Sequence, residues 1–155
     1  MSSLNNIEMI CSKENIVINF SKLNQQTVDE LISIVRTVKQ SNPKKVLLNL
    51  SDDTEIYEPL SYRERLDWSR QGQILTALVN SSSVPFVAII KGHINAELSE
   101  LATSCSFIMT VDDASINFGD GLIYVPRWGV LDRVRDVLSV LDVRKIYTSQ
   151  SNKVW

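Results

Sequence analysis

One stretch in the middle of the chain, residues 84–111, restricts the fold more than any other. It begins with an apolar run, Val84–Ile90, that predicts a buried strand, and Gly92 then predicts a turn. Ala96–Ser104 has a helical composition, and Phe107–Val111 is rich in β-branched and aromatic residues, which favours a second strand. A strand, a helix and a strand in this order form a βαβ unit, so we expect two buried, parallel strands.

The segment before this unit predicts a hairpin, a helix and a further strand. Residues 7–20 contain two short apolar strands around a polar turn. Apolar residues recur at helical spacing over Val28–Gln40, and a capping box from Thr27 to Glu30 is expected to begin that helix. Lys45–Leu50 is a second uninterrupted apolar run, so we expect a strand parallel to those of the central unit and buried on both faces.

Two further helices are predicted on either side of the central unit. Ser61 and Glu64 form a capping box that begins a helix reaching about Asn80. Apolar residues at helical spacing between Val130 and Leu141 predict the other helix. The inward face of the first of these helices is expected to hold Leu66, Leu75, Leu78 and Val79.

The size and charge of the chain exclude several classes of protein. With 155 residues, 44% of them hydrophobic, residues 1–155 are expected to form a single domain with a proper core. A net charge of −2 argues against a nucleic-acid or membrane-surface protein. The chain has no apolar run of membrane-spanning length and no signal peptide at its N-terminus, so we expect a cytoplasmic protein. Cys11 and Cys105 stand singly, which indicates neither a metal site nor a disulfide framework.

A motif in the central unit indicates a family. A proline-anchored apolar strand is followed by a glycine and histidine turn, by Glu-Leu-Ala and a cysteine, and after the next strand by Ala-x-Phe-Gly. This order and spacing resemble the crotonase (enoyl-CoA hydratase/isomerase) superfamily, whose pattern has three glycines where this chain has Ala96, Glu97 and Leu98. The matching residues are Pro85, Gly92, His93, Glu100, Leu101, Ala102, Cys105, Ala114, Phe118 and Gly119.

The resemblance implies an α/β fold, a crotonase-like βαβ spiral with parallel strands and outer helices. Crotonases continue into C-terminal helices that cover the acyl pocket and build a trimer, whereas this chain ends at Trp155, before that segment. Its loss should expose apolar surface, and exposed apolar patches usually mark interfaces. We therefore expect a homo-oligomer or a protein partner, with the segments Trp128–Leu141 and Lys145–Trp155 involved.

The resemblance also implies a chemistry. Crotonases bind an acyl-CoA thioester and stabilise its enolate with two backbone N–H groups, each commonly worth about 3–4 kcal/mol. Glu100 aligns with a family glutamate that acts as acid and base, although glutamates in a first helical turn are also favoured by the helix dipole. The second family carboxylate falls on Leu122, so Asp120 is the candidate substitute, with a turn residue as the alternative. No metal and no cofactor are implied beyond a coenzyme A thioester as candidate substrate.

Other residues of the motif are candidates for substrate binding, namely Gly92, His93, Ala96, Glu97 and Leu98. His93 has no serine or cysteine partner in the sequence, which favours a structural role. Glu97 takes the position of the glycine whose N–H points at the thioester oxygen. A carboxylate about 4 Å from the enolate would oppose it by about 4 kcal/mol at an effective dielectric near 20, or roughly a thousandfold in rate. Pointing into solvent, it would matter far less.

Two functions remain after these departures. The loop Ser51–Leu60, where the family's Gly-Ala-Asp loop supplies the other N–H group, contains no glycine. The favoured interpretation is a degenerate crotonase-fold protein, similar to accessory subunits found beside polyketide-type synthases, that binds an acyl-CoA, a carrier-protein thioester or a partner. The alternative is a divergent lyase or isomerase that acts on an acyl thioester. The aromatic residues Tyr57, Tyr62, Trp68 and Trp128 are candidates for an acyl pocket, a partner surface or the core.

Overall fold

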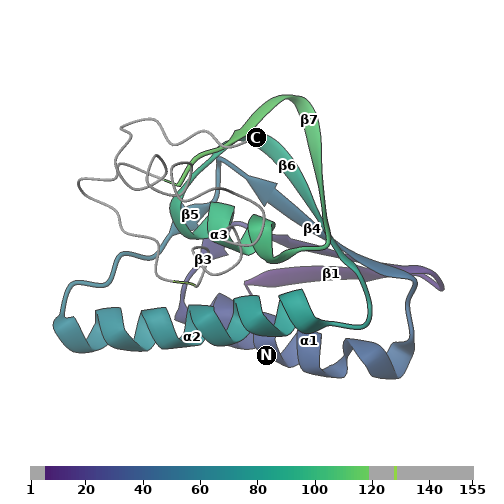
Figure 1. Cartoon of the computed structure of the whole chain (residues 1–155), viewed down its shortest axis with the longest axis horizontal. Helices are drawn as coiled ribbons and strands as arrows, with labels where there is room; N and C mark the ends of the chain where they lie inside the picture. The colour runs from purple at the N-terminus through teal and green to yellow at the C-terminus, as the bar shows by residue number, and fades with distance from the viewer. Residues whose placement is uncertain (1–5, 119–127, 129–155) are drawn as a thin grey trace, which may run out of the picture.

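The computed structural model describes residues 6–118 and residue 128, which form one main sheet with helices packed against it (Figure 1). β1 pairs with β2 in antiparallel fashion, and the other neighbouring pairs are parallel. This arrangement confirms the predicted α/β fold with three parallel strands. The strands, in their order across the sheet, are β1 (Ile7–Cys11), β2 (Asn15–Phe20), β4 (Lys45–Ser51), β6 (Phe86–Ile94) and β7 (Phe107–Ile116).

Three helices and a second, small sheet complete the described fold. In Figure 1, α1 and α2 run side by side below the strands, and α3 lies between α2 and the strands. The small sheet was not predicted, because each of its strands has only two residues. The helices are α1 (Gln25–Ser41), α2 (Tyr62–Ser81) and α3 (Ala96–Ser104), and the small sheet consists of β3 (Lys22–Leu23) and β5 (Glu55–Ile56) in parallel. Among these residues no helix is both long and apolar enough to cross a membrane.

The core lies on one face of the main sheet. Alternate residues of β2, β4 and β6 point toward the helices and are buried. The opposite face is less covered, and on β7 the side chains of Phe107, Met109 and Val111 are exposed. The prediction that all parallel strands are buried on both faces is therefore wrong for β7, because β7 is the last strand of the sheet. The buried strand residues facing the helices include Ile16, Ile18, Val46, Leu48, Leu50, Ala88 and Ile90.

The helix starts are set by side-chain caps. Ser61 caps α2 by accepting a hydrogen bond from the N–H of Glu64 at 3.1 Å, which confirms the predicted start of this helix. α1 begins earlier than predicted, because Asn24 is its cap and accepts from the N–H of Thr27 at 2.9 Å. The capping box predicted from Thr27 to Glu30 is therefore wrong.

The inward face of α2 also differs from the prediction. Leu75 and Val79 are buried as expected, whereas Leu66 is 38% exposed. The buried positions one and two turns before Leu75 belong to Gly72 and Trp68. The buried face of α2 includes small and polar residues, so a pattern based on apolar residues alone did not identify it.

Gly92 does not turn the chain, as its sequence context predicted. It lies inside β6 with a φ of 78°, at a register shift between Lys91 and His93 in the pairing with β7. A residue with positive φ at such a bulge lets the strand bend and continue, and glycine adopts this conformation without a steric penalty. β6 therefore runs on to Ile94 and leads directly into α3.

Candidate functional site

The junction between β6 and α3 holds the candidate residues of the motif. Asn95 is the cap residue of α3, and its side chain makes no capping hydrogen bond. Ala96 follows with a φ of 51°, in the left-handed region that favours glycine. A non-glycine residue there costs about 1–2 kcal/mol. The junction therefore keeps a backbone conformation suited to glycine, although the side chain is that of alanine.

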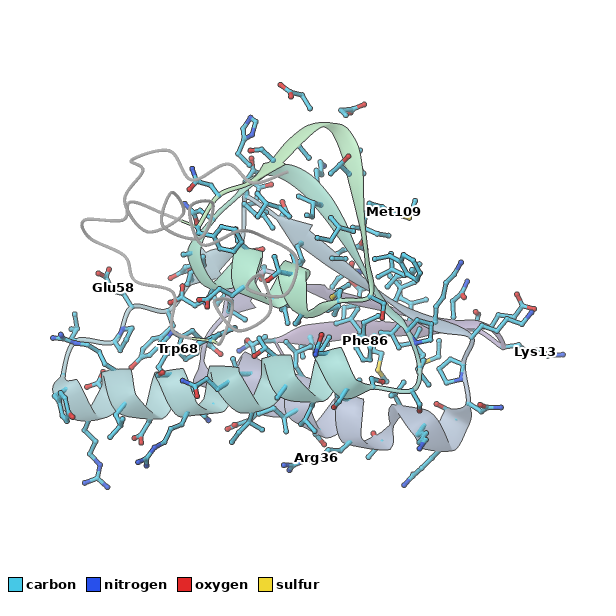
Figure 2. All side chains as sticks on the ribbon, in the orientation of Figure 1. Lys13, Arg36, Glu58, Trp68, Phe86 and Met109 are labelled. Carbon is cyan, nitrogen blue, oxygen red and sulfur yellow. The ribbon has the colours of Figure 1, made fainter. Side chains whose placement is uncertain are left out.

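The side chain of Glu97 points into the protein. Only 3% of the residue is exposed, and its Oε1 accepts a hydrogen bond from Nε1 of Trp68 at 3.3 Å. Trp68 comes from α2, and Figure 2 shows it between α2 and α3. The carboxylate of Glu97 therefore does not point into solvent. A solvent-facing carboxylate would have had the weakest effect on an enolate.

Glu100 is fully buried one turn further along α3. Its Oε1 accepts a hydrogen bond from the backbone N–H of Trp128 at 2.8 Å. The carbonyl oxygen of Trp128 in turn accepts from the hydroxyl of Thr76 on α2 at 2.7 Å. Trp128 is thus bound through both of its backbone polar groups, one to each helix.

The indole of Trp128 packs directly on the backbone of α2. A Cβ atom added at Gly72 would overlap its ring, so only glycine leaves room for the tryptophan at this position. Trp128 and Trp68 meet edge to face with ring centroids 5.1 Å apart. Together the two tryptophans occupy the space between α2 and the two glutamates of α3.

Tyr57 extends this aromatic group toward the start of α2. Its ring lies edge to face with Trp68 at a centroid distance of 5.1 Å, and its hydroxyl donates to Oε2 of Glu64 at 2.8 Å. This hydrogen bond raises the pKa of Tyr57 and is the largest cause of the lowered pKa of Glu64. Tyr62, the fourth candidate aromatic residue, is exposed and does not join the group.

The glycine-free loop after β4 directs its backbone N–H groups at partners within the chain. The N–H groups of Asp52 and Thr54 bond to Lys91 and Ser51, at 3.2 and 3.1 Å. Those of Glu55 and Tyr57 bond to carbonyl groups of residues 21 and 23, at 2.9 and 2.8 Å. These four N–H groups are therefore engaged within the chain.

Gly92 and His93 belong to a second polar cluster, at the ends of three neighbouring strands. The carboxylate of Asp52 lies against Gly92, where a Cβ atom would overlap it, and accepts from the N–H of His93 at 3.3 Å. Nδ1 of His93 is 2.7 Å from the hydroxyl of Ser115 on β7. His93 thus has a serine partner that its sequence neighbourhood did not reveal, although Ser115 is largely buried.

The remaining candidates contribute less to this site. Leu98 is buried in the hydrophobic core. Asp120 and Leu122 lie outside the described residues, as does the predicted helix between Val130 and Leu141. Within the described part of the chain, no three histidine, cysteine or acidic side chains are grouped as a metal ion would require.

Sequence reasoning missed the partners of the glutamates. Trp68 and Trp128 are 29 and 28 residues away from Glu97 and Glu100, so no local pattern connects them. Gly72 was the one available signal, because an isolated glycine inside a predicted helix often marks a close approach by another group.

The arrangement defines a class of protein first: an α/β protein with a mostly parallel sheet and buried glutamates on α3, the short helix after β6. No protein-family profile and no curated protein sequence matches the chain. Solved structures do match, and they are crotonase-type folds.

Three of these structures illustrate the likeness. Enoyl-CoA hydratase from Thermoplasma volcanium aligns with a TM-score of 0.82 and 13% identity, over 97% of this chain and 66% of its own. The Bacillus anthracis enoyl-CoA hydratase gives 0.79 and 17%, over 96% and 65%. Pseudomonas aeruginosa PA4980 gives 0.81 and 16%, over 99% and 74%. The chain therefore has the crotonase fold and spans about two thirds of the length of the two hydratases.

Proposed function

We propose that this protein acts by binding, as a degenerate crotonase-fold partner in acyl-thioester metabolism of the coenzyme A or polyketide type, with little catalysis of its own. The proposed binding partner is an acyl-CoA, a carrier-protein thioester or the enzyme that acts on one. The proposed compartment is the cytoplasm.

One observation carries this proposal: both glutamates of α3 are buried against tryptophans. Glu97 Oε1 accepts from the Trp68 indole, and Glu100 Oε1 accepts from the Trp128 backbone. An acid or base must come within hydrogen-bond reach of the substrate proton that it transfers. A carboxylate enclosed by α2, α3 and Trp128 has its accepting oxygen directed at the protein.

The loop after β4 supports the same conclusion. Oxyanion stabilisation requires donors that point at the place where charge develops. Four N–H groups between Asp52 and Tyr57 are already directed at carbonyl groups of the chain.

A divergent enzyme is the second candidate, and Ala96 favours it. Strained backbone conformations persist where the surrounding structure imposes them, and they cluster at functional sites. The φ of 51° at Ala96 is such a conformation, at the start of the helix that carries Glu100. Such an enzyme would be a crotonase-type lyase or isomerase, with Glu100 moving the proton.

Titration calorimetry with crotonyl-CoA and free coenzyme A, followed by a hydration assay, separates the two candidates. The binding role predicts weak or absent thioester binding and no turnover by the wild-type protein. Glu97→Gly, which removes the bulk and charge at the former glycine position, should then increase thioester affinity. Glu8→Gln, an exposed glutamate on β1, is the matched control and should change nothing.

Glu100→Gln tests the alternative, that the protein is a divergent enzyme. It keeps the shape of the side chain and removes the group that transfers a proton. Tight thioester binding with turnover that this substitution abolishes would overturn the binding role and establish a divergent enzyme. An enzyme whose activity rises when this protein is added would support the accessory role.

A further inference from the structure

β7 combines two features that a pairing surface needs, an open edge and exposed apolar side chains. It is the last strand of the main sheet, and no described residue pairs with its outer edge. Phe107, Met109 and Val111 are 63%, 59% and 43% exposed on the face of the sheet away from the helices. Figure 2 shows Met109 on this outer side. A long apolar edge strand of this kind is a template for another strand.

The residues between these three present their backbone groups to the open edge. The N–H groups of Val46 and Asp52 bond to the carbonyl oxygens of Pro85 and Lys91, so Val87, Ile89 and Lys91 direct their backbone groups to β4. Successive residues of a strand direct these groups to opposite sides. Phe107, Met109 and Val111 are aligned with these three residues, so they direct their N–H and C=O groups to β6, while their side chains cover the outer face. Ile108 and Thr110 therefore direct theirs to the open edge.

We propose that β7 pairs in antiparallel fashion with β7 of a second copy of this chain, about a two-fold axis at Met109. This register places Met109 opposite its own copy and Phe107 opposite Val111. Opposed residues of an antiparallel pair share a face, so the exposed apolar side chains of both copies form one continuous surface. Ile108 then lies opposite Thr110 of the copy, and the outward N–H and C=O groups of both residues are hydrogen-bonded.

The distribution of polar residues favours a second copy of the chain as the partner of β7, and it favours this register. Asp112 and Asp113 follow the apolar segment, and in this pairing they lie opposite Ser106 and Cys105. A register shifted toward the end of the strand would place the acidic residues of the two copies opposite one another, which is destabilising. On the same face, the β1–β2 half of the sheet carries Glu8 and Asn19 beside Ile10, so its apolar surface is interrupted by polar residues, whereas Phe107, Met109 and Val111 follow one another without interruption.

Cysteine cross-linking tests the register. In a Cys11→Ser background, which removes an exposed native thiol, Met109→Cys should form a disulfide-linked dimer under mild oxidation. Antiparallel partners that are not hydrogen-bonded to one another, as the two copies of residue 109 are in this register, have Cα atoms about 4.5 Å apart, within the span of a disulfide. Ile10→Cys in the same background is the control, because Ile10 is also half exposed on the outer face but lies on β1, at the far edge. It should not cross-link.

Sedimentation equilibrium of the otherwise native chain tests the association itself. Wild-type protein should dimerise, and Met109→Lys should raise the dissociation constant roughly tenfold or more, because it removes a buried apolar side chain and opposes two charges. Ile10→Lys should leave the constant unchanged.

Three outcomes would overturn the proposal. A wild-type monomer whose residue 109 cysteine reacts readily with a maleimide would exclude self-pairing. A monomer in which that cysteine is protected would mean that another segment of the same chain covers β7. A dimer lost through Ile10→Lys and kept by Met109→Lys would place the interface at β1. None of these results depends on thioester binding, so the proposed function is tested separately.

Discussion

The two faces of the strands β6 and β7 differ in how completely the described chain covers them. On the helix side, Glu97 and Glu100 find hydrogen-bond donors in Trp68 and Trp128, and the aromatic rings fill the space around them. On the outer side, apolar side chains of β7 remain exposed. The helix side is therefore built for internal stability, whereas the outer side has apolar surface left for association. Substitutions on the two faces should affect different measurements.

Two aromatic truncations give the largest expected contrast. Trp68→Ala removes a fully buried ring, its contacts with Tyr57 and Trp128, and the donor to Glu97, and should lower the free energy of unfolding by about 3–5 kcal/mol. Phe107→Ala removes an exposed ring and should lower it by less than about 1 kcal/mol in the monomer. Urea unfolding at low protein concentration measures both. Equal losses would show that the outer face is covered as well as the helix side.

Gly72→Ala tests whether Trp128 packs on α2 as described, and its sign is diagnostic. At an unobstructed position inside a helix, glycine to alanine stabilises by about 0.5–1 kcal/mol. Here the new Cβ would overlap the indole, so we expect a loss of about 1–3 kcal/mol instead. Gln73→Ala, an exposed neighbour on α2, is the control and should be close to neutral. A stabilised Gly72→Ala protein would mean that Trp128 lies elsewhere.

The sequence predicted the main sheet well because its parallel strands are local apolar runs. β4, β6 and β7 each begin within two residues of the predicted start. The prediction failed where distant parts of the chain decide the structure. β6 continues through Gly92 because β7 accepts the register shift, and β5 forms because its backbone bonds to residues 21 and 23.

The candidate site was predicted only in part, for the same reason. Glu97 and Glu100 were identified from a local motif, and both lie at the start of α3 as that motif implied. Their environment depends on residues from α2 and from position 128, which no local pattern connects to them. The carboxylate of Glu97, which was expected to face a substrate or solvent, is therefore buried against Trp68.

Thr76→Val measures how firmly Trp128 is held by its carbonyl group. Valine keeps the shape of threonine and removes the hydroxyl that donates to Trp128 at 2.7 Å. A buried carbonyl oxygen left without this donor should cost about 1–3 kcal/mol in unfolding free energy. Thr37→Val, on an exposed part of α1 where the hydroxyl bonds only within its own helix, is the matched control. Similar small losses in both proteins would show that this hydrogen bond does not hold the tryptophan.

The smallest expected effect is a pH dependence at the start of α2, where the aromatic group reaches the surface. Hydrogen bonds from Tyr57, Ser61 and the Leu60 N–H lower the pKa of Glu64 in the folded protein. A carboxyl whose folded pKa is depressed stabilises the fold above its unfolded pKa, and this contribution disappears as the pH falls through the folded value. Glu64→Gln should therefore lower the midpoint of thermal unfolding at neutral pH and lose this difference from wild type in acid. Glu58→Gln, an exposed neighbour in the same loop, should follow the wild-type profile throughout. If Glu64→Gln and wild type instead differ equally at neutral and acidic pH, the carboxylate of Glu64 does not hold Tyr57, and the aromatic group ends at Trp68.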